Sequence, residues 1–226
     1  MDFTKIKKQD ILFSAGCALV LLPFFISKDV YNFYINFNNA HGFIASAVKF
    51  AVLATAGECI GLRIRKGVYN ERGFGILPRA LVWAALGVAI KAAFIIFSAG
   101  TPKVLAYAGL QNMPKVFTAF SISVAINTIF APVFMTLHKI TDTHILQTGG
   151  ALRGFFTPIP FGKIISGMDW QRQWDFVFKK TIPLFWYPAH TITFMLPEAW
   201  QTLFAALLGV ALGILLALSA KKQPSN

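Results

Sequence analysis

The sequence predicts an all-α integral membrane protein, with a single membrane domain over residues 1–226 in which about six transmembrane helices form a bundle. Three observations predict this fold. The chain is 56% hydrophobic and only 13% charged, whereas soluble domains are about 45–50% apolar and about 25% charged. Several apolar runs approach the roughly 20 residues that a helix needs to cross a bilayer. Most of the 21 Lys and Arg residues fall between those runs.

The first three predicted spans lie in the N-terminal half. Residues 11–27 follow a basic start and lack a small-x-small cleavage pattern behind them, so we expect an uncleaved signal anchor. Residues 42–64 and 76–99 are longer apolar runs, and each is long enough to cross the hydrocarbon core.

The C-terminal half is predicted to hold three more spans. Residues 115–137 are apolar apart from a few interruptions, and residues 199–220 form an almost continuous apolar run. Residues 182–198 are shorter and contain three prolines. This segment therefore either spans or re-enters the membrane, and five spans with one re-entrant segment is the alternative topology.

Residues 138–181 form the only long predicted loop, on the inner side. Near its end Trp170 and Trp174 recur at helical spacing beside basic residues. That pattern is typical of a helix lying in the membrane interface, here near 168–180. The alternative is a lead-in to the next span that has no function of its own.

The net charge of +12 has two interpretations, because a basic chain can bind nucleic acid or can use its charge to set membrane topology. With six spans and both termini on the inner side, 15 of the 21 basic residues lie on that side and only three lie in outer loops. This distribution follows the positive-inside rule. We therefore expect a lipid bilayer as partner and no nucleic acid.

Ionisable residues inside the spans are candidate functional groups, because burying charge in a membrane is costly. Lys49 and Lys91 each lie about 22 Å from the inner end of adjacent helices. They either snorkel to the outer interface or form a basic ring that favours anions. Glu58 lies near the inner mouth, where it can pair with Arg79 or Arg63.

Polar residues also fall close to the predicted midplane. Asn127 and His190 each lie about ten residues from the inner surface, and Thr193 adds a hydroxyl near His190. Such residues either line a cavity at helix breaks or hydrogen-bond neighbouring helices together. We keep all three as candidate pore-lining residues beside Lys49, Glu58 and Lys91.

The second half of the chain resembles a known family, the peroxisomal membrane protein 22-kilodalton and Mpv-type mitochondrial channel family. The family's signature has a Gln shortly before Phe-Ala-Pro, then a loop, a Trp-Pro pair and a further spaced motif. Asn127 replaces that Gln, and His190 and Thr193 replace a later Gln and Asn. The residues that match this pattern are Phe130, Ala131, Pro132, Trp186, Pro188, Phe194 and Pro197.

The resemblance is clearest over residues 126–219, and it has three departures. The family's Asp before the Gln is Ile126 here, its Trp-Pro pair is split by Tyr187, and the Arg after the last Pro is Gln201. Members of the family are thought to form weakly selective pores for small metabolites. The resemblance therefore implies a channel-like role.

Together these observations predict a small-solute channel or carrier that is weakly selective, with the two lysines favouring anions. The alternative is a membrane scaffold that transports nothing and binds a protein partner through residues 138–181. A third hypothesis is a membrane-embedded enzyme acting on lipid near His190. We do not favour an enzyme, because the spans contain no paired aspartates and the chain contains no GxSxG motif.

No cofactor and no metal are predicted. His138, Asp142 and His144 stand together in the predicted loop, but they lack a fourth ligand and regular spacing. Gly209 and Gly213 permit close helix packing within the chain or between copies, so a homo-oligomer stays open. A prokaryotic plasma membrane is the favoured location, with a mitochondrial inner or peroxisomal membrane as the alternative.

Overall fold

The structure, a computed structural model, describes residues 7–222, and these contain helices and connecting turns with no strand. The helices in chain order are α1 (Lys8–Ile26), α2 (Lys28–Ala40), α3 (Gly42–Lys66), α4 (Ile76–Tyr107), α5 (Lys115–Ile129), α6 (Ala131–Gln147), α7 (Leu152–Phe155), α8 (Phe161–Ser166), α9 (Trp170–Arg172), the π-helical segment η1 (Gln173–Trp186), α10 (Tyr187–Met195) and α11 (Glu198–Lys222). The all-helical fold class predicted from the sequence is confirmed.

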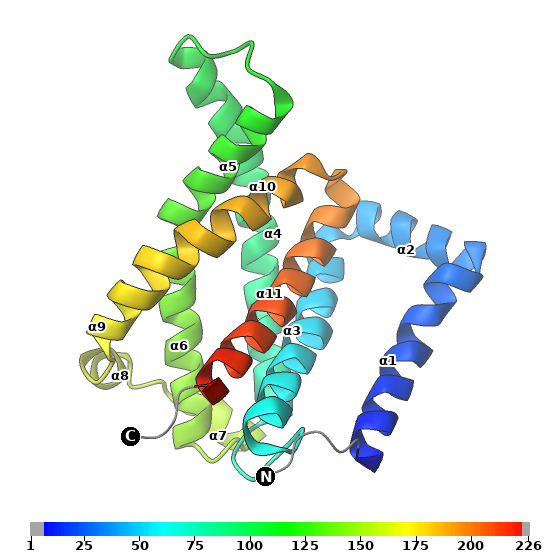
Figure 1. The fold of residues 1–226 in the computed structure, drawn as a ribbon, viewed down its shortest axis with the longest axis vertical. Coiled ribbons are helices and arrows are strands. Elements are labelled where there is room, and N and C mark those ends of the chain that lie inside the picture. The colour runs from blue at the N-terminus through cyan, green and yellow to red at the C-terminus, as the bar shows by residue number, and fades with distance from the viewer. Residues whose placement is uncertain (1–6, 223–226) are drawn as a thin grey trace.

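The helices run back and forth between two ends of an elongated bundle (Figure 1). We call the end with the turn 67–75 and with α7 the basal end, and the end with α2 and the turn 108–114 the apical end. α1 rises, α3 returns, α4 rises, α5 and α6 descend, η1 with α10 rises, and α11 returns. α1 therefore begins, and α11 ends, at the basal end.

Several of these helices are compatible with a membrane protein. Within the described residues, α1, α3, α4 and α11 are long and apolar enough to cross a membrane. The bent pair α5 and α6 makes a fifth candidate if it counts as one span, with an angle of 46° between its two helices. The predicted segment 182–198 is divided between η1, α10 and the first residue of α11.

Two regions differ from the sequence prediction. α4 continues eight residues beyond the predicted span 76–99, through Pro102 to Tyr107, and together with α5 it forms a hairpin that projects at the apical end (Figure 1). α6 continues to Gln147, so the first ten residues of the predicted loop 138–181 are helical. The helix predicted near 168–180 is present as α9 and the first part of η1.

α3 lies at the centre of the bundle, between α4 and α11. Close backbone contact with α4 is possible because Gly87 has no side chain, and the Ser46 hydroxyl donates a hydrogen bond to the Gly87 carbonyl at 2.8 Å. On the other face of α3, Gly57 packs against Val210 of α11. Small residues at helix contacts are the usual means of close packing in membranes.

α1 stands apart from this core, and none of its residues is buried. It is tied to the basal end by the Asp10 carboxylate, which receives hydrogen bonds from Arg63 at 2.6 and 2.7 Å and from the Tyr69 hydroxyl at 3.0 Å. Burial, followed by the hydrogen bond to Asp10, raises the pKa of the Tyr69 phenol above its ordinary value. Because so much of α1 is apolar and exposed, its long face needs lipid or protein to cover it.

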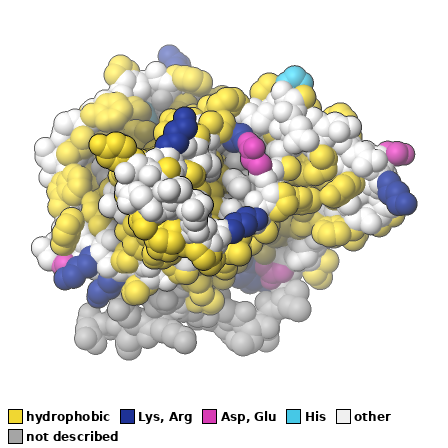
Figure 2. Space-filling view, turned by 90° about the horizontal axis from the view of Figure 1, so that it is seen from above, with side chains coloured by type: hydrophobic (Ala, Val, Ile, Leu, Met, Phe, Trp, Pro, Cys, Tyr) yellow, Lys and Arg dark blue, Asp and Glu magenta, His cyan; other side chains and the backbone are white. Residues whose placement is uncertain are grey.

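The outer surface is mostly uncharged. Seen from the apical end, hydrophobic side chains form broad patches with only scattered Lys, Arg, Asp and Glu between them (Figure 2). Long side chains with more than half of their surface exposed include Phe25, Ile96, Val133 and Leu184, from four different helices. A soluble protein rarely exposes such continuous apolar surface, so this surface is compatible with contact to lipid.

The α3–α4 contact generates the first prediction. A side chain at Gly87 would place its Cβ 2.8 Å from the Ser46 carbonyl oxygen and from the Phe50 Cβ. We expect Gly87→Leu to lower stability by about 1–3 kcal/mol, because overpacking forces the helices apart. The measurement is thermal unfolding in detergent, followed by reaction of the buried Cys59 thiol in a Cys17→Ser background.

Gly100→Leu on the same helix is the matched control, because a Cβ there meets nothing within 4 Å. An unfolding midpoint of Gly87→Leu equal to that of the control would contradict the close contact between α3 and α4.

Candidate functional site

A buried charge cluster joins three helices near the basal end. Arg79, in the first turn of α4, is the central residue. Its Nη1 lies 2.5 Å from a carboxylate oxygen of Glu58 on α3 and also forms an ion pair with Asp142 on α6. Its Nε donates to the carbonyl of Phe74 at 2.7 Å. One guanidinium therefore holds α3, α4 and α6 together.

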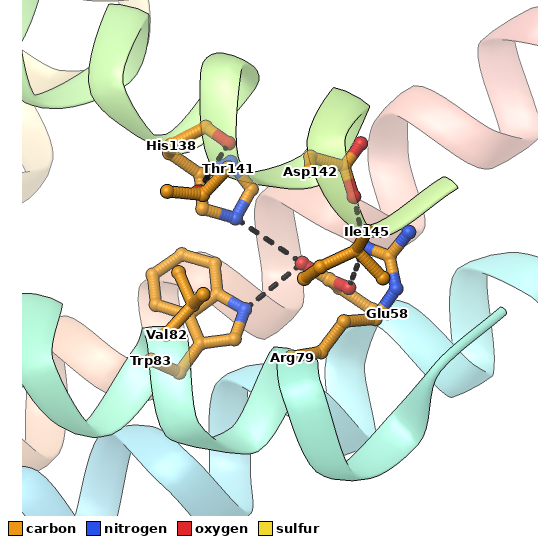
Figure 3. A pocket seen from close by; sticks show the side chains of 8 residues that line it. All are labelled: Glu58, Arg79, Val82, Trp83, His138, Thr141, Asp142 and Ile145. Atoms are coloured by element: carbon orange, nitrogen blue, oxygen red, sulfur yellow. Dashed lines mark hydrogen bonds and ion pairs between the residues drawn. The ribbon is translucent and has the colours of Figure 1, made fainter. Parts of the chain in front are cut away.

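The second carboxylate oxygen of Glu58 has two further partners (Figure 3). The indole Nε1 of Trp83 donates to it at 2.9 Å, and Nε2 of His138 lies 3.3 Å away. The Trp83 and His138 rings also pack together, with centroids 4.5 Å apart. Arg79 of α4 thus binds one oxygen of Glu58, while Trp83 of α4 and His138 of α6 contact the other.

The sequence spacing explains this convergence. Arg79 and Trp83 are four residues apart on α4, and His138 and Asp142 are four residues apart on α6, so each pair lies on one helix face. Both faces turn toward Glu58 (Figure 3). The arrangement confirms the predicted pairing of Glu58 with Arg79, while the alternative partner, Arg63, pairs with Asp10 instead.

The charges in this cluster do not balance when His138 is neutral. Two carboxylates, Glu58 and Asp142, share a single arginine. The three side chains are only 8% to 21% exposed, so water screens them incompletely, and an uncompensated charge there is costly. With a neutral His138 the cluster therefore carries one excess negative charge, which a proton on His138 or a bound cation would balance.

The cluster forms one wall of a large cavity of about 670 Å³. Pockets that hold small-molecule ligands have volumes of about 300–1,000 Å³. The cavity extends from the exposed residues Arg65 and Lys66 at the basal end, past Glu58, to Asn127 and His190 deeper in the bundle. Residues of α3, α4, α5, α6, η1, α10 and α11 line it.

Asn127 and His190 form the second polar level of the cavity. Nδ1 of His190 lies 2.9 Å from Nδ2 and 3.1 Å from Oδ1 of Asn127, so the amide orientation and the histidine tautomer together set the donor. The Asn127 amide also donates to the Ser123 carbonyl at 2.8 Å. Trp186 lies against the His190 ring at 4.9 Å, and its indole Nε1 is buried with no hydrogen-bond partner among the described residues.

The two lysines proposed as an anion-favouring ring do not line this cavity. Lys49 is buried and donates to Asn38 on α2 and, at 3.0 Å, to Thr202 on α11. Lys91 forms an ion pair with Glu198 at 2.7 Å, at the apical end. Both lysines therefore connect helices at the far side of the core.

Tyr34 on α2 lies beside Lys49. The Lys49 ammonium lies 5.2 Å from the centre of the Tyr34 ring. Burial raises the pKa of the Tyr34 phenol to about 12, so this group stays neutral over the physiological range. Lys49 and Tyr34 are thus part of the packing that holds α2 against α3 and α11.

The remaining predicted residues are divided between the cavity and the core. Thr193 is completely buried, and its hydroxyl donates to the Ala189 carbonyl at 3.1 Å, so it does not line the cavity. The other motif residues are placed as follows: Phe130, Ala131 and Trp186 line the cavity; Pro132 is in the first turn of α6 at the bend; Phe194 is in the apolar core; Pro188 and Pro197 are exposed near the ends of α10.

His138, Asp142 and Trp83 are site residues that sequence reasoning did not single out as such. The sequence predicts a loop around His138 and Asp142, and in a loop the spacing of two residues does not show that they lie on the same side. The missed signal is that the i, i+4 spacing of both residues continues the helical periodicity of α6. Within residues 7–222, no group of three potential ligands is placed to hold a metal ion.

The shared arginine generates the second prediction. Arg79→Gln leaves two buried carboxylates without their cation, so we expect a loss of about 3–5 kcal/mol of stability. The double variant Glu58→Gln, Arg79→Gln should recover a large part of this loss, because it removes one uncompensated charge. Thermal unfolding followed by Cys59 reactivity measures both.

Arg65→Gln is the matched control, because Arg65 is exposed and has no ion-pair partner among the described residues. If Arg79→Gln unfolds at the same temperature as this control, the cluster does not stabilise the bundle.

No family model, curated protein or solved structure matches this chain. The resemblance to the peroxisomal and Mpv-type channel family therefore stays a prediction. Function has to be inferred from the geometry of the cavity and the chemistry of its walls.

Proposed function

We propose that this protein is a small-solute carrier or channel of a cellular membrane, with the cavity between α3, α4, α6 and α11 as its solute path. The observation that carries the proposal is a cavity of about 670 Å³ with charged and amide groups on its wall, inside a bundle of apolar helices. Buried charge at membrane depth is costly and marks solute paths in membrane proteins.

The shape of the cavity favours a carrier-like mechanism. At the basal end the wall includes the exposed residues Arg65 and Lys66. At the other limit it meets Phe50, Ile90 and Phe94, which belong to the buried apolar core. A solute can therefore enter from one side, while the core closes the path to the apical end, as alternating access requires.

The orientation follows from the basic residues near the entrance. Arg63, Arg65, Lys66 and Arg72 all lie within or beside the basal turn 67–75. The positive-inside rule places such a cluster on the cytoplasmic side or its equivalent. In this proposal the cavity therefore opens inward, and the apical end with Lys91 and Glu198 faces the outer side.

The helix breaks supply the flexibility that such a path needs. α5 and α6 meet at Phe130 with a bend of 46°, and Pro132 follows at the start of α6. η1 contains Pro183 within a π-helical stretch. π-Helical turns are rare in proteins, and where they interrupt an α-helix they often lie at functional sites. Both breaks flank the level of Asn127 and His190.

A steric block of the cavity generates the third prediction. Gly209 lines the cavity, and a Cβ there meets nothing within 4 Å, so Gly209→Leu fills space without a clash at Cβ. We expect proteoliposomes of the wild type to take up small solutes faster than protein-free liposomes, and Gly209→Leu to lower that uptake at least fivefold. Light scattering with a size series of neutral and charged solutes measures it.

Gly100→Leu serves as control for the added bulk, because its site is equally open and lies outside the cavity. Absence of any protein-dependent flux, at either sign of the membrane potential, would refute the proposal. Equal flux through Gly209→Leu and Gly100→Leu would remove this cavity as the path.

A further inference from the structure

We propose that the cavity binds a monovalent, amphipathic organic cation, which balances the excess negative charge that the Glu58–Arg79–Asp142 cluster carries when His138 is neutral. This inference rests on the proposed function, because it names the chemical class of the solute. It differs from the anion preference that the positions of Lys49 and Lys91 suggest in the sequence.

The charge balance of the wall is the first step. Lys66 is paired with Glu71 at 2.6 Å near the entrance, and the exposed Arg65 lies in water where salt screens its charge. Deeper in the wall, Glu58 and Asp142 share Arg79, and Glu58 also contacts His138. When His138 is neutral, the deep part of the cavity therefore carries one excess negative charge.

Asp142 is the carboxylate open to a ligand. Glu58 receives hydrogen bonds from Trp83 and Arg79 and contacts His138. Asp142 contacts only the shared Arg79, through its Oδ1, and no partner for its Oδ2 is found within the described residues. A cationic group in the cavity would give the Asp142 carboxylate a second ion-pair partner, since both Asp142 and Glu58 line the wall.

The rest of the cavity wall suits the apolar part of a ligand, because that part can pack against aromatic rings. Its aromatic rings come from six different segments of the chain: Phe50, Phe74, Trp83, Phe94, Phe130, Phe134 and Trp186. Aromatic faces attract organic cations by about 0.5–2 kcal/mol each, and more strongly when water is excluded. A cation with an apolar body therefore matches this wall better than a small hydrated ion.

Exposed apolar side chains also belong to the cavity wall. Leu146 on α6 and Leu216 on α11 both line the cavity and are 53% and 39% exposed. They add to the surface against which the apolar part of an amphipathic cation can pack.

The test compares two ions of nearly the same size and opposite charge, tetraphenylphosphonium and tetraphenylborate. Equilibrium binding is measured at pH 8, where histidine side chains are ordinarily neutral, with the full chain in nanodiscs of uncharged lipid and empty nanodiscs subtracted. We expect saturable binding of the phosphonium at one site per chain and at least tenfold weaker binding of the borate.

Two pairs of variants locate the site. Asp142→Asn should weaken phosphonium binding at least tenfold, while Asp29→Asn, the same change on the exposed surface of α2, should leave it unchanged. Gly209→Leu should abolish binding and Gly100→Leu should not. Asp142→Asn leaves the Arg79–Glu58 pair intact, so we expect this variant to fold. The reactivity of Cys59 checks the folding of each variant.

The outcomes separate this inference from the proposed function. Stronger binding of the borate, no saturable binding of the phosphonium, or an unchanged affinity in Asp142→Asn would overturn the inference. Solute flux without phosphonium binding would leave the carrier proposal standing alone. Phosphonium binding without any flux would keep the cation site and refute transport.

Discussion

The guanidinium of Arg79 is the group on which the basal half of the bundle depends. It is held by carboxylates from α3 and α6 and by the carbonyl of Phe74. Ion pairs in a low-dielectric environment are costly to assemble but also costly to break from one side. The cluster therefore favours one arrangement of α3, α4 and α6, and its charged groups form part of the cavity wall.

The apical half is held together in a different way. There the α3–α4 contact is made by small residues and by the apolar core around Phe50 and Phe94. Lys49 connects α3 to α2 and α11, and Lys91 connects α4 to α11. In that half close apolar packing is supplemented by a few buried hydrogen bonds, those of Ser46 and Lys49. One end of the molecule is thus densely packed and the other surrounds an open volume.

Much of the fold follows from local features of the sequence. Long apolar runs place α3 and α11 within two residues of their predicted bounds, because a helix needs roughly 20 apolar residues to cross the hydrocarbon core. α4 begins where predicted but continues past the predicted end. Counting residues from the helix ends also brought Glu58 together with Arg79, and Asn127 with His190, because the rise per residue converts sequence position into depth. Both pairs lie in the structure at contact distance.

The features that the sequence analysis missed depend on contacts between distant segments. Lys91 lacks a carboxylate at its own predicted depth, yet Glu198 reaches it because α11 begins there. Lys49 finds Asn38 because α2 folds back over α3, which no periodicity indicates. His138 and Asp142 were hidden because the polar run around them resembles a loop, although α6 continues through it.

The break between α5 and α6 separates the two polar levels of the cavity. Asn127 belongs to α5 and is tied to α10 through His190, whereas His138 and Asp142 belong to α6 and are tied to α3 and α4. With an angle of 46° between the two helices, the two levels belong to different mechanical units joined at Phe130. A tilt of either unit would change the distance between the Asn127–His190 level and the charge cluster, so one backbone joint sets the spacing of the two polar levels.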